Sequence, residues 1–278
     1  MPSDENSPEF RALLRETGIA AELLAAGVTA LGKANSVQHG WYNQAFFNLS
    51  IGFERAAKIV LVLNHCLEHS GAFPSDSDLR GYGHNIKDLL RRADEISQHR
   101  RSGGEYTTLP ATSIHQGIIE TLSEFASATR YYNLDLLVQG RGKAFSDPLA
   151  AWIVRVGKPI LEQHYSAKRR DADKRRAETL EQLIGSRTLV RHHNEAGAPI
   201  SSVEGAALYT AEMRVVQRYG QLHTLQIVRF LAFLISDLTH QAHQRRLTKI
   251  PYLNEFFAMF INDDAYFKSR RTWSIYRR

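Results

Sequence analysis

The sequence predicts an all-α protein, a helical bundle that uses almost the whole chain. Apolar residues recur every three or four positions in one segment after another, which is the spacing that lines one face of an α-helix. No alternation of apolar and polar residues is long enough to predict a useful strand. With 278 residues, 43% of them apolar, the chain can bury a sizeable core in one large helical domain or in two smaller ones.

Two helices are expected in the first seventy residues. Ser7-Pro8 is typical of a helix start, and the apolar period that follows it ends near Gly32. The next apolar face extends from Tyr42 to Leu67. That helix should stop near Ser70-Gly71, because glycine suits a left-handed C-terminal cap.

A turn and a further helix follow. Residues 73–78 have turn chemistry that does not extend a helix, and Gly81-Tyr82-Gly83 leads into apolar positions that again keep the helical period from Ile86 onward. His84 is therefore expected in the first turn of this helix, where backbone N–H groups lack partners.

The two helices on either side of this turn carry short strings that resemble a known family. In the first helix the strings are Phe53, Glu54, Arg55, Ala57 and Lys58, and in the second they are Gly83, His84, Ile86, Leu89 and Leu90. They resemble the HEPN families, helical domains of prokaryotic toxin–antitoxin and antiviral systems. The resemblance extends from about Trp41 to Leu137, where the string from Arg130 to Asp135 resembles part of a later helix. It implies a HEPN-like helical domain in the N-terminal half.

Family members that cut RNA carry an Arg, four to six intervening residues and a His. In that pairing the His relays a proton from the ribose 2′-hydroxyl while the Arg holds the phosphate. Arg92 and His99 have this spacing within the resembling region, whereas Arg80 and His84 are separated by only three residues. Two other pairs with this spacing lie outside the region, Arg187 with His192 and Arg218 with His223. The catalytic candidates are therefore Arg80, His84, Arg92 and His99, and the sequence leaves open whether the protein is an enzyme.

Several of these residues also have a structural interpretation. His84 is either a capping or packing histidine or a catalytic base. Arg55 and Lys58 are either solvated or paired with Glu54, or they bind phosphate. Glu54 and Lys58 are four residues apart, which is a favourable spacing for an ion pair on a helix. Tyr131 is either half-buried packing or a platform on which a base stacks. The residues expected to contact nucleic acid are Arg55, Lys58, Lys87, Arg130, Tyr131, Arg169, Arg170, Arg175 and Arg176.

The C-terminal half is also expected to be helical. A helix from about Thr112 to Val138 should end before Gly140–Lys143, which is either an interdomain linker or a small anion-binding loop. We place the domain boundary near residue 145, with a HEPN-like domain at 1–145 and a second helical domain at 146–278. Pro159 should bend or break the first helix of that second half.

Three features of the second half bear on function. The charge run Lys168–Arg176 is either a solvated helix face or a sequence-independent contact to phosphates. Ser201–Glu204 supplies cap material for a long helix that ends at about Gln244. The aromatic, basic tail from Pro251 is expected to pack on the core or at a subunit interface, with clamping of single-stranded nucleic acid as the alternative.

Composition narrows the choice of partner and compartment. The net charge of +6 favours a polyanionic partner such as RNA. The single Cys66 excludes an intramolecular disulfide and is expected to be a buried thiol. The N-terminus does not resemble a secretory signal, and the most apolar window, Ile227–Leu238, contains Arg229 and is too short to span a bilayer. We therefore expect a cytoplasmic protein with no membrane, metal or cofactor partner.

Two hypotheses remain. The first is a non-catalytic HEPN-like protein that binds RNA or a partner protein in a prokaryotic defence or toxin–antitoxin system, with the second half mediating self-association into a homodimer. The second is a metal-independent HEPN endoribonuclease that brings two Arg/His pairs together as a dimer.

Overall fold

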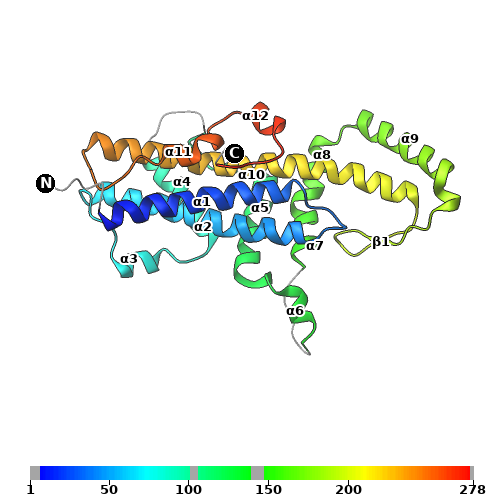
Figure 1. Ribbon diagram of the computed structural model, residues 1–278, viewed down its shortest axis with the longest axis horizontal. Coiled ribbons are helices and arrows are strands. Elements are labelled where there is room, and N and C mark those ends of the chain that lie inside the picture. Colours follow the sequence, from blue (N-terminus) through cyan, green and yellow to red (C-terminus); the bar gives the residue numbers. More distant parts are fainter. Residues whose placement is uncertain (1–6, 101–105, 139–146, 276–278) are drawn as a thin grey trace.

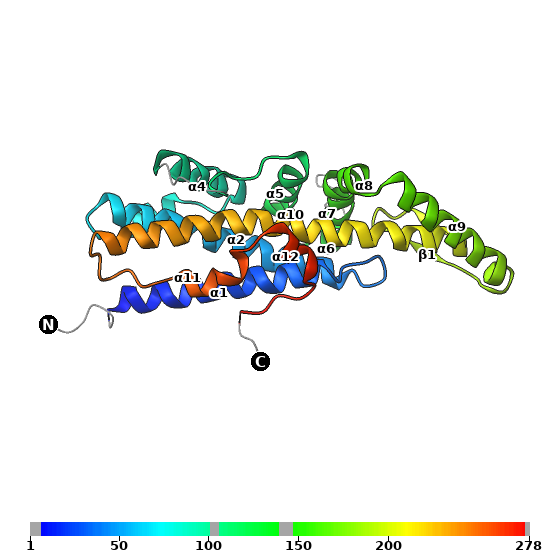
Figure 2. The same cartoon turned by 90° about the horizontal axis from the view of Figure 1, so that it is seen from above.

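The computed structural model describes residues 7–100, 106–138 and 147–275, and within them it confirms an all-α protein. The main helices are α1 (Pro8–Leu31), α2 (Gly40–Glu68), α4 (Ile86–Arg100), α5 (Ser113–Glu124), α9 (Ala167–Ile184) and α10 (Val203–Gln244). The strands β1 (His192–His193) and β2 (Pro199–Ile200) form a single antiparallel hairpin. Helices α1, α2 and α10 run along the long axis of the molecule (Figure 1). Figure 2 shows α4, α5 and α8 (Lys158–His164) on one side of α10 and α1 on the other.

Helices α1 and α2 pack closely because each presents a glycine to a leucine of the other. A Cβ atom at Gly27 would lie 2.7 Å from Leu49 Cγ, and one at Gly52 would lie 2.9 Å from Leu24 Cγ. Both contacts are too short for any larger residue without a shift of the neighbouring leucine. The apolar face predicted for α2 is buried as expected.

The predicted ends of the helices are confirmed where they depend on local caps. Ser7 Oγ accepts a hydrogen bond from Phe10 N at 3.1 Å, and Ser202 Oγ accepts one from Gly205 N at 3.0 Å. After α2, Gly71 has φ +91° and its N–H donates to Cys66 O at 2.7 Å. The Cys66 thiol is buried, as predicted, and burial raises its pKa to about 11.

The turn before α4 differs from the prediction in two ways. Ser75 starts a short helix, α3 (Asp76–Gly81), through a capping box with Asp78. The placement of His84 in the first turn of the next helix is wrong, because α4 begins at Ile86. Asn85 takes the capping role instead, since its Oδ1 accepts from Asp88 N at 3.2 Å.

The single helix predicted from Thr112 to Val138 is also wrong. Helix α5 gives way to a π-helical turn at Phe125–Thr129, and α6 (Tyr132–Leu136) projects from the body of the molecule (Figure 1). Ser127 Oγ donates to Ser123 O at 2.9 Å within this turn and so competes for a helix carbonyl. Residues 130–134 after this turn line a pocket together with residues of α2.

A break near Pro159 is confirmed. Helix α7 (Pro148–Trp152) continues into a π-helical turn at Ile153–Gly157, and α8 then begins with Pro159 in its first turn. A proline is tolerated there because its missing N–H has no intrahelical partner.

One apolar core extends over residues from both halves of the sequence. Trp152 of α7 lies with its ring centroid 5.4 Å from that of Phe46 of α2, and Phe125 lies 5.5 Å from the same ring. The tail packs on this core as predicted, because Phe257, Phe260, Phe267 and Trp273 are all buried. The domain boundary near residue 145 and the linker Gly140–Lys143 fall outside the described residues, and the two-domain division stays a prediction.

Helix α10 is the one helix among the described residues that is long and apolar enough to cross a membrane. Its most apolar window is 78% buried inside the protein. Such burial is typical of the central helix of a bundle, and α10 contacts α1, α2 and α8.

Candidate functional site

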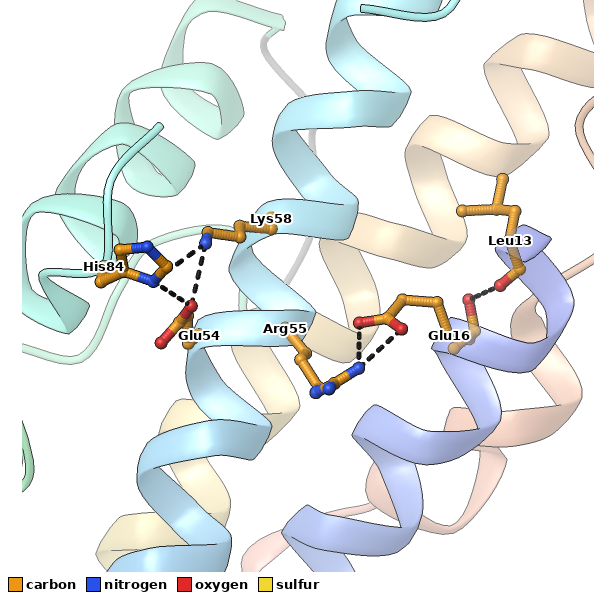
Figure 3. Close-up of polar contacts among 7 residues, drawn as sticks. Leu13, Glu16, Glu54, Arg55, Lys58 and His84 are labelled. Carbon is orange, nitrogen blue, oxygen red and sulfur yellow. Dashed lines mark hydrogen bonds and ion pairs between the residues drawn. The ribbon is translucent and has the colours of Figure 1, made fainter. Parts of the chain in front are cut away.

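A polar cluster joins the middle of α2 to the segment before α4. The His84 imidazole Nδ1 lies 2.8 Å from Glu54 Oε1, and Lys58 Nζ lies 2.8 Å from the same oxygen (Figure 3). Lys58 Nζ is also 3.5 Å from His84 Nδ1. The carboxylate accepts a hydrogen bond from Nδ1–H, so the other ring nitrogen, Nε2, is left for a ligand.

The cluster keeps its carboxylate ionised. Burial by itself would raise the pKa of Glu54, but the hydrogen bonds from Lys58 and His84 outweigh it and lower the pKa below its usual value. The side chains of Glu54 and Lys58 are only 24% and 22% exposed, whereas that of His84 is 85% exposed. Glu54 therefore acts as a fixed, charged anchor that orients an accessible imidazole.

Arg130 borders the same surface pocket as His84. The pocket has a volume of about 310 Å³ and lies between α2, the start of α4 and the π-helical turn, with Glu54, Asn85, Ser123 and Ser127 also in its lining. The Arg130 guanidinium lies 5.0 Å from the centroid of the Phe47 ring. Its Nε is buried and has no hydrogen-bond partner among the described residues. We call this pocket, together with Lys58, which contacts its Glu54 and His84 without lining it, the His84 pocket.

No protein-family model matches the chain, and neither does any curated protein or solved structure. The chemistry of the His84 pocket is therefore argued from its own geometry. A guanidinium and an ammonium near an oriented imidazole are groups that can bind a phosphate, because both cations donate hydrogen bonds to anionic oxygens.

Other predicted nucleic-acid contacts lie outside this pocket. Arg55 points to the opposite side of α2, where its Nη1 donates to both carboxylate oxygens of Glu16 on α1 at 2.6 Å (Figure 3). Lys87 lies 3.5 Å from Glu120. Tyr131 is 62% exposed, so its expected half-buried packing is wrong, and it lines a second pocket next to Arg130.

The remaining catalytic candidates are separated from His84. Arg80 is on α3, where it pairs with Asp76 at 2.8 Å in an exposed i,i+4 bridge. Arg92 and His99, two turns apart on α4, line another pocket of about 340 Å³ together with Tyr82. The Arg92 guanidinium lies 5.1 Å from the Tyr82 ring centroid. The structure thus brings Arg92 and His99 to one pocket and His84 with Arg130 to a different one.

The basic run on α9 is a solvated helix face, and α9 lies at the far end of the molecule from α3 (Figure 1). Arg169 and Arg176 both approach Asp173, at 3.7 and 3.6 Å. The guanidinium of Arg170 lies 5.3 Å from the Tyr165 ring centroid, and Arg175 is exposed. These side chains do not contribute to the His84 pocket.

A buried histidine cluster was not foreseen in the sequence. His223 Nε2 lies 3.2 Å from His164 Nε2, and Gln226 Oε1 lies within 2.9 Å of both His115 Nε2 and His223 Nδ1. Burial lowers the pKa of His115 and His164, and burial together with the neighbouring His115 lowers the pKa of His223 to about 4. No spacing signal links residues that come from three different helices.

Across residues 7–100, 106–138 and 147–275, no group of three or more His, Cys, Asp and Glu side chains is placed to hold a metal ion. His192 and His193 are exposed on β1 and lie outside the cluster.

Proposed function

We propose that this chain is a HEPN-like, cytoplasmic protein that binds RNA at the His84 pocket without cleaving it, as part of a prokaryotic defence or toxin–antitoxin system. The observation that carries the proposal is the placement of Arg130 beside the pocket of His84 with no ion-pair partner among the described residues. An unpaired guanidinium at a surface is available for a phosphate oxygen.

The balance of charge in the pocket supports an anionic ligand. Lys58 and Arg130 carry positive charge, and Glu54 is the one carboxylate in the lining. Because Lys58 and His84 already satisfy that carboxylate, it repels an incoming phosphate less than a free one would. The chain's net charge of +6 favours encounter with a polyanion.

The absence of a second proton-transfer group favours binding over cleavage. Cleavage of RNA by the 2′-hydroxyl needs a base on one side of the phosphate and an acid on the other. Among the described residues the lining of the His84 pocket contains one imidazole, and the neighbouring ammonium, Lys58, is already hydrogen-bonded to Glu54. A single chain therefore offers groups that bind a phosphate but no second group that is free to protonate the leaving oxygen.

The alternative function is a metal-independent endoribonuclease that acts as a dimer. The hydrogen bond from His84 to Glu54 favours it, because a carboxylate that orients an imidazole is a recurring feature of general-base catalysis. A second copy would supply the missing acid.

Arg130→Ala tests RNA binding. Fluorescence anisotropy with a labelled 12-nucleotide single-stranded RNA should show an affinity about tenfold lower than wild type, since one charge-assisted phosphate contact is lost. The slope of log affinity against log salt should become shallower by about 0.7. Arg15→Ala, an exposed arginine on α1, is the matched control and should bind like wild type. A wild-type chain that binds no RNA would overturn the proposal and leave a protein partner as the ligand to be sought.

Incubation with total RNA in EDTA separates the two functions. We expect intact RNA with the wild-type protein, because Lys58, the second possible acid beside His84, is held by Glu54. Cleavage that persists in EDTA and is lost in His84→Ala would show the endoribonuclease. Cleavage lost instead in His99→Ala would assign it to the pocket of Arg92 and His99.

We further propose that the protein is a homodimer that associates through the end of α9. Leu183 and Ile184 there are 67% and 44% exposed, and Leu189 beyond them is 79% exposed, so water covers an apolar surface in the single chain. Light scattering should give a mass twice the 31.5 kDa of the chain, and Leu183→Glu should return it to that of one chain. A wild-type protein that is monomeric at micromolar concentration would contradict this proposal.

A further inference from the structure

A second pocket, of about 540 Å³, adjoins the His84 pocket and shares Arg130 with it. It lies between the first half of α2 and the segment from the π-helical turn to α6. Its volume falls in the range of sites for small organic ligands. Two chemistries meet in its lining, namely carboxamide side chains and aromatic rings.

The carboxamides come from two helices. Asn43, Gln44 and Asn48 project from α2, and Asn133 projects from α6. None of the four makes a side-chain hydrogen bond with another described residue, and all four are exposed or half-buried. A carboxamide carries both a donor and an acceptor, which is the pair needed to bind the edge of a nucleobase in the plane of its ring.

The aromatic rings belong to Phe47 and Tyr131, which are 42% and 62% exposed. Rings of this size are costly to leave in water unless a ligand or partner covers them. Exposed rings beside a basic group are the usual platform on which unpaired bases of single-stranded RNA stack. Arg130 lies over Phe47, so its guanidinium sits between this pocket and the His84 pocket.

We propose that this second pocket takes one unpaired nucleobase of an RNA strand whose adjoining phosphate lies at Arg130. The proposal rests on the proposed RNA binding and adds to it a source of base preference. Arg130 and Lys58 hold the backbone without regard to sequence, while the carboxamides and rings bind the base itself. A purely apolar ligand would leave the four carboxamides without partners, so the lining favours a flat, polar heterocycle.

The test compares two labelled single-stranded probes of equal length, a 12-nucleotide RNA and its abasic counterpart, which keeps the ribose–phosphate backbone. Wild-type protein should bind the base-bearing RNA about tenfold more tightly, since stacking and edge contacts of one base contribute about this factor. Asn48→Ala and Tyr131→Ala should each lose most of that preference and leave affinity for the abasic probe unchanged. Arg130→Ala should weaken the binding of both probes.

Matched controls are available on the described surface. Asn254→Ala and Tyr252→Ala remove an exposed carboxamide and an exposed ring from outside the pocket and should leave both affinities unchanged. A melting temperature equal to that of the wild type excludes a folding defect as the cause of lost binding in a variant.

The outcomes distinguish the two proposals. Equal affinity of the wild-type protein for both probes would overturn the base pocket and leave RNA binding at the His84 pocket intact. A preference for bases that survives in both Asn48→Ala and Tyr131→Ala would also overturn it. Failure to bind either probe would overturn RNA binding and the base pocket together.

Discussion

Trp152→Ala lowers the free energy of unfolding by about 3–5 kcal/mol, the usual cost of truncating a large buried aromatic side chain. Trp152 is 1% exposed and contacts the Phe46 ring across the two halves of the sequence. Its removal leaves a cavity at the centre of the shared core, which rigid helices on both sides fill only in part.

Urea denaturation followed by circular dichroism measures this loss. Trp41→Ala, which removes a half-buried tryptophan at the start of α2, should cost much less and serves as the control. We expect one unfolding transition, because residues from both halves contribute to one core. A loss below about 1 kcal/mol would contradict the central role of Trp152. Two separate transitions would support independent domains on either side of residue 145.

Acidification from pH 7 to pH 4 should destabilise the protein through His223. The folded-state pKa of His223 is about 4, whereas an unfolded histidine has its ordinary value of about 6.5. The folded state thus binds the proton more weakly than the unfolded state does. The contribution of neutral His223 to the free energy of unfolding is fully present above pH 6.5. It is lost as the pH falls from 6.5 to 4, which lowers the free energy of unfolding by about 3 kcal/mol in all.

The surroundings of His223 explain why its pKa is lowered. Burial is the largest cause of the lowered pKa, and repulsion from His115 is the next. The hydrogen bond to Gln226 opposes them less strongly, and the remaining effects, lowering by His164 and raising by Asp264, are smaller still. Arg229 lies beside this group, where it pairs with Asp264 at 2.9 Å. Protonation of His115 as well would lower the free energy of unfolding further, since His115 is also buried and has a lowered pKa.

Comparison with His223→Gln isolates this contribution from that of the carboxylates. The difference in unfolding free energy between wild type and His223→Gln should change by about 3 kcal/mol between pH 7 and pH 4. His240→Gln, at an exposed position on α10, should show no such change. An equal pH dependence in wild type and His223→Gln would contradict the assignment.

The sequence determined the features that depend on neighbours within about one helical turn. The apolar spacing predicted the helices, Ser7 and Ser202 predicted two of their starts, and Gly71 predicted the end of α2. The bridge from Lys58 to Glu54 belongs to the same class, because residues four apart lie side by side on a helix. Such interactions follow from local backbone geometry alone.

Only the tertiary structure decided which side chains meet across helices. It paired Arg55 with Glu16, 39 positions away, and His84 with Glu54, 30 positions away. It also brought Arg130 to the pocket of His84 and set Arg92 and His99 apart from it. The π-helical break at Phe125–Thr129 could not be predicted from the sequence either, because the apolar spacing of the predicted helix continues through it. These outcomes depend on how helices pack, and packing is set by shape complementarity over the whole core rather than by the spacing of residues in one segment.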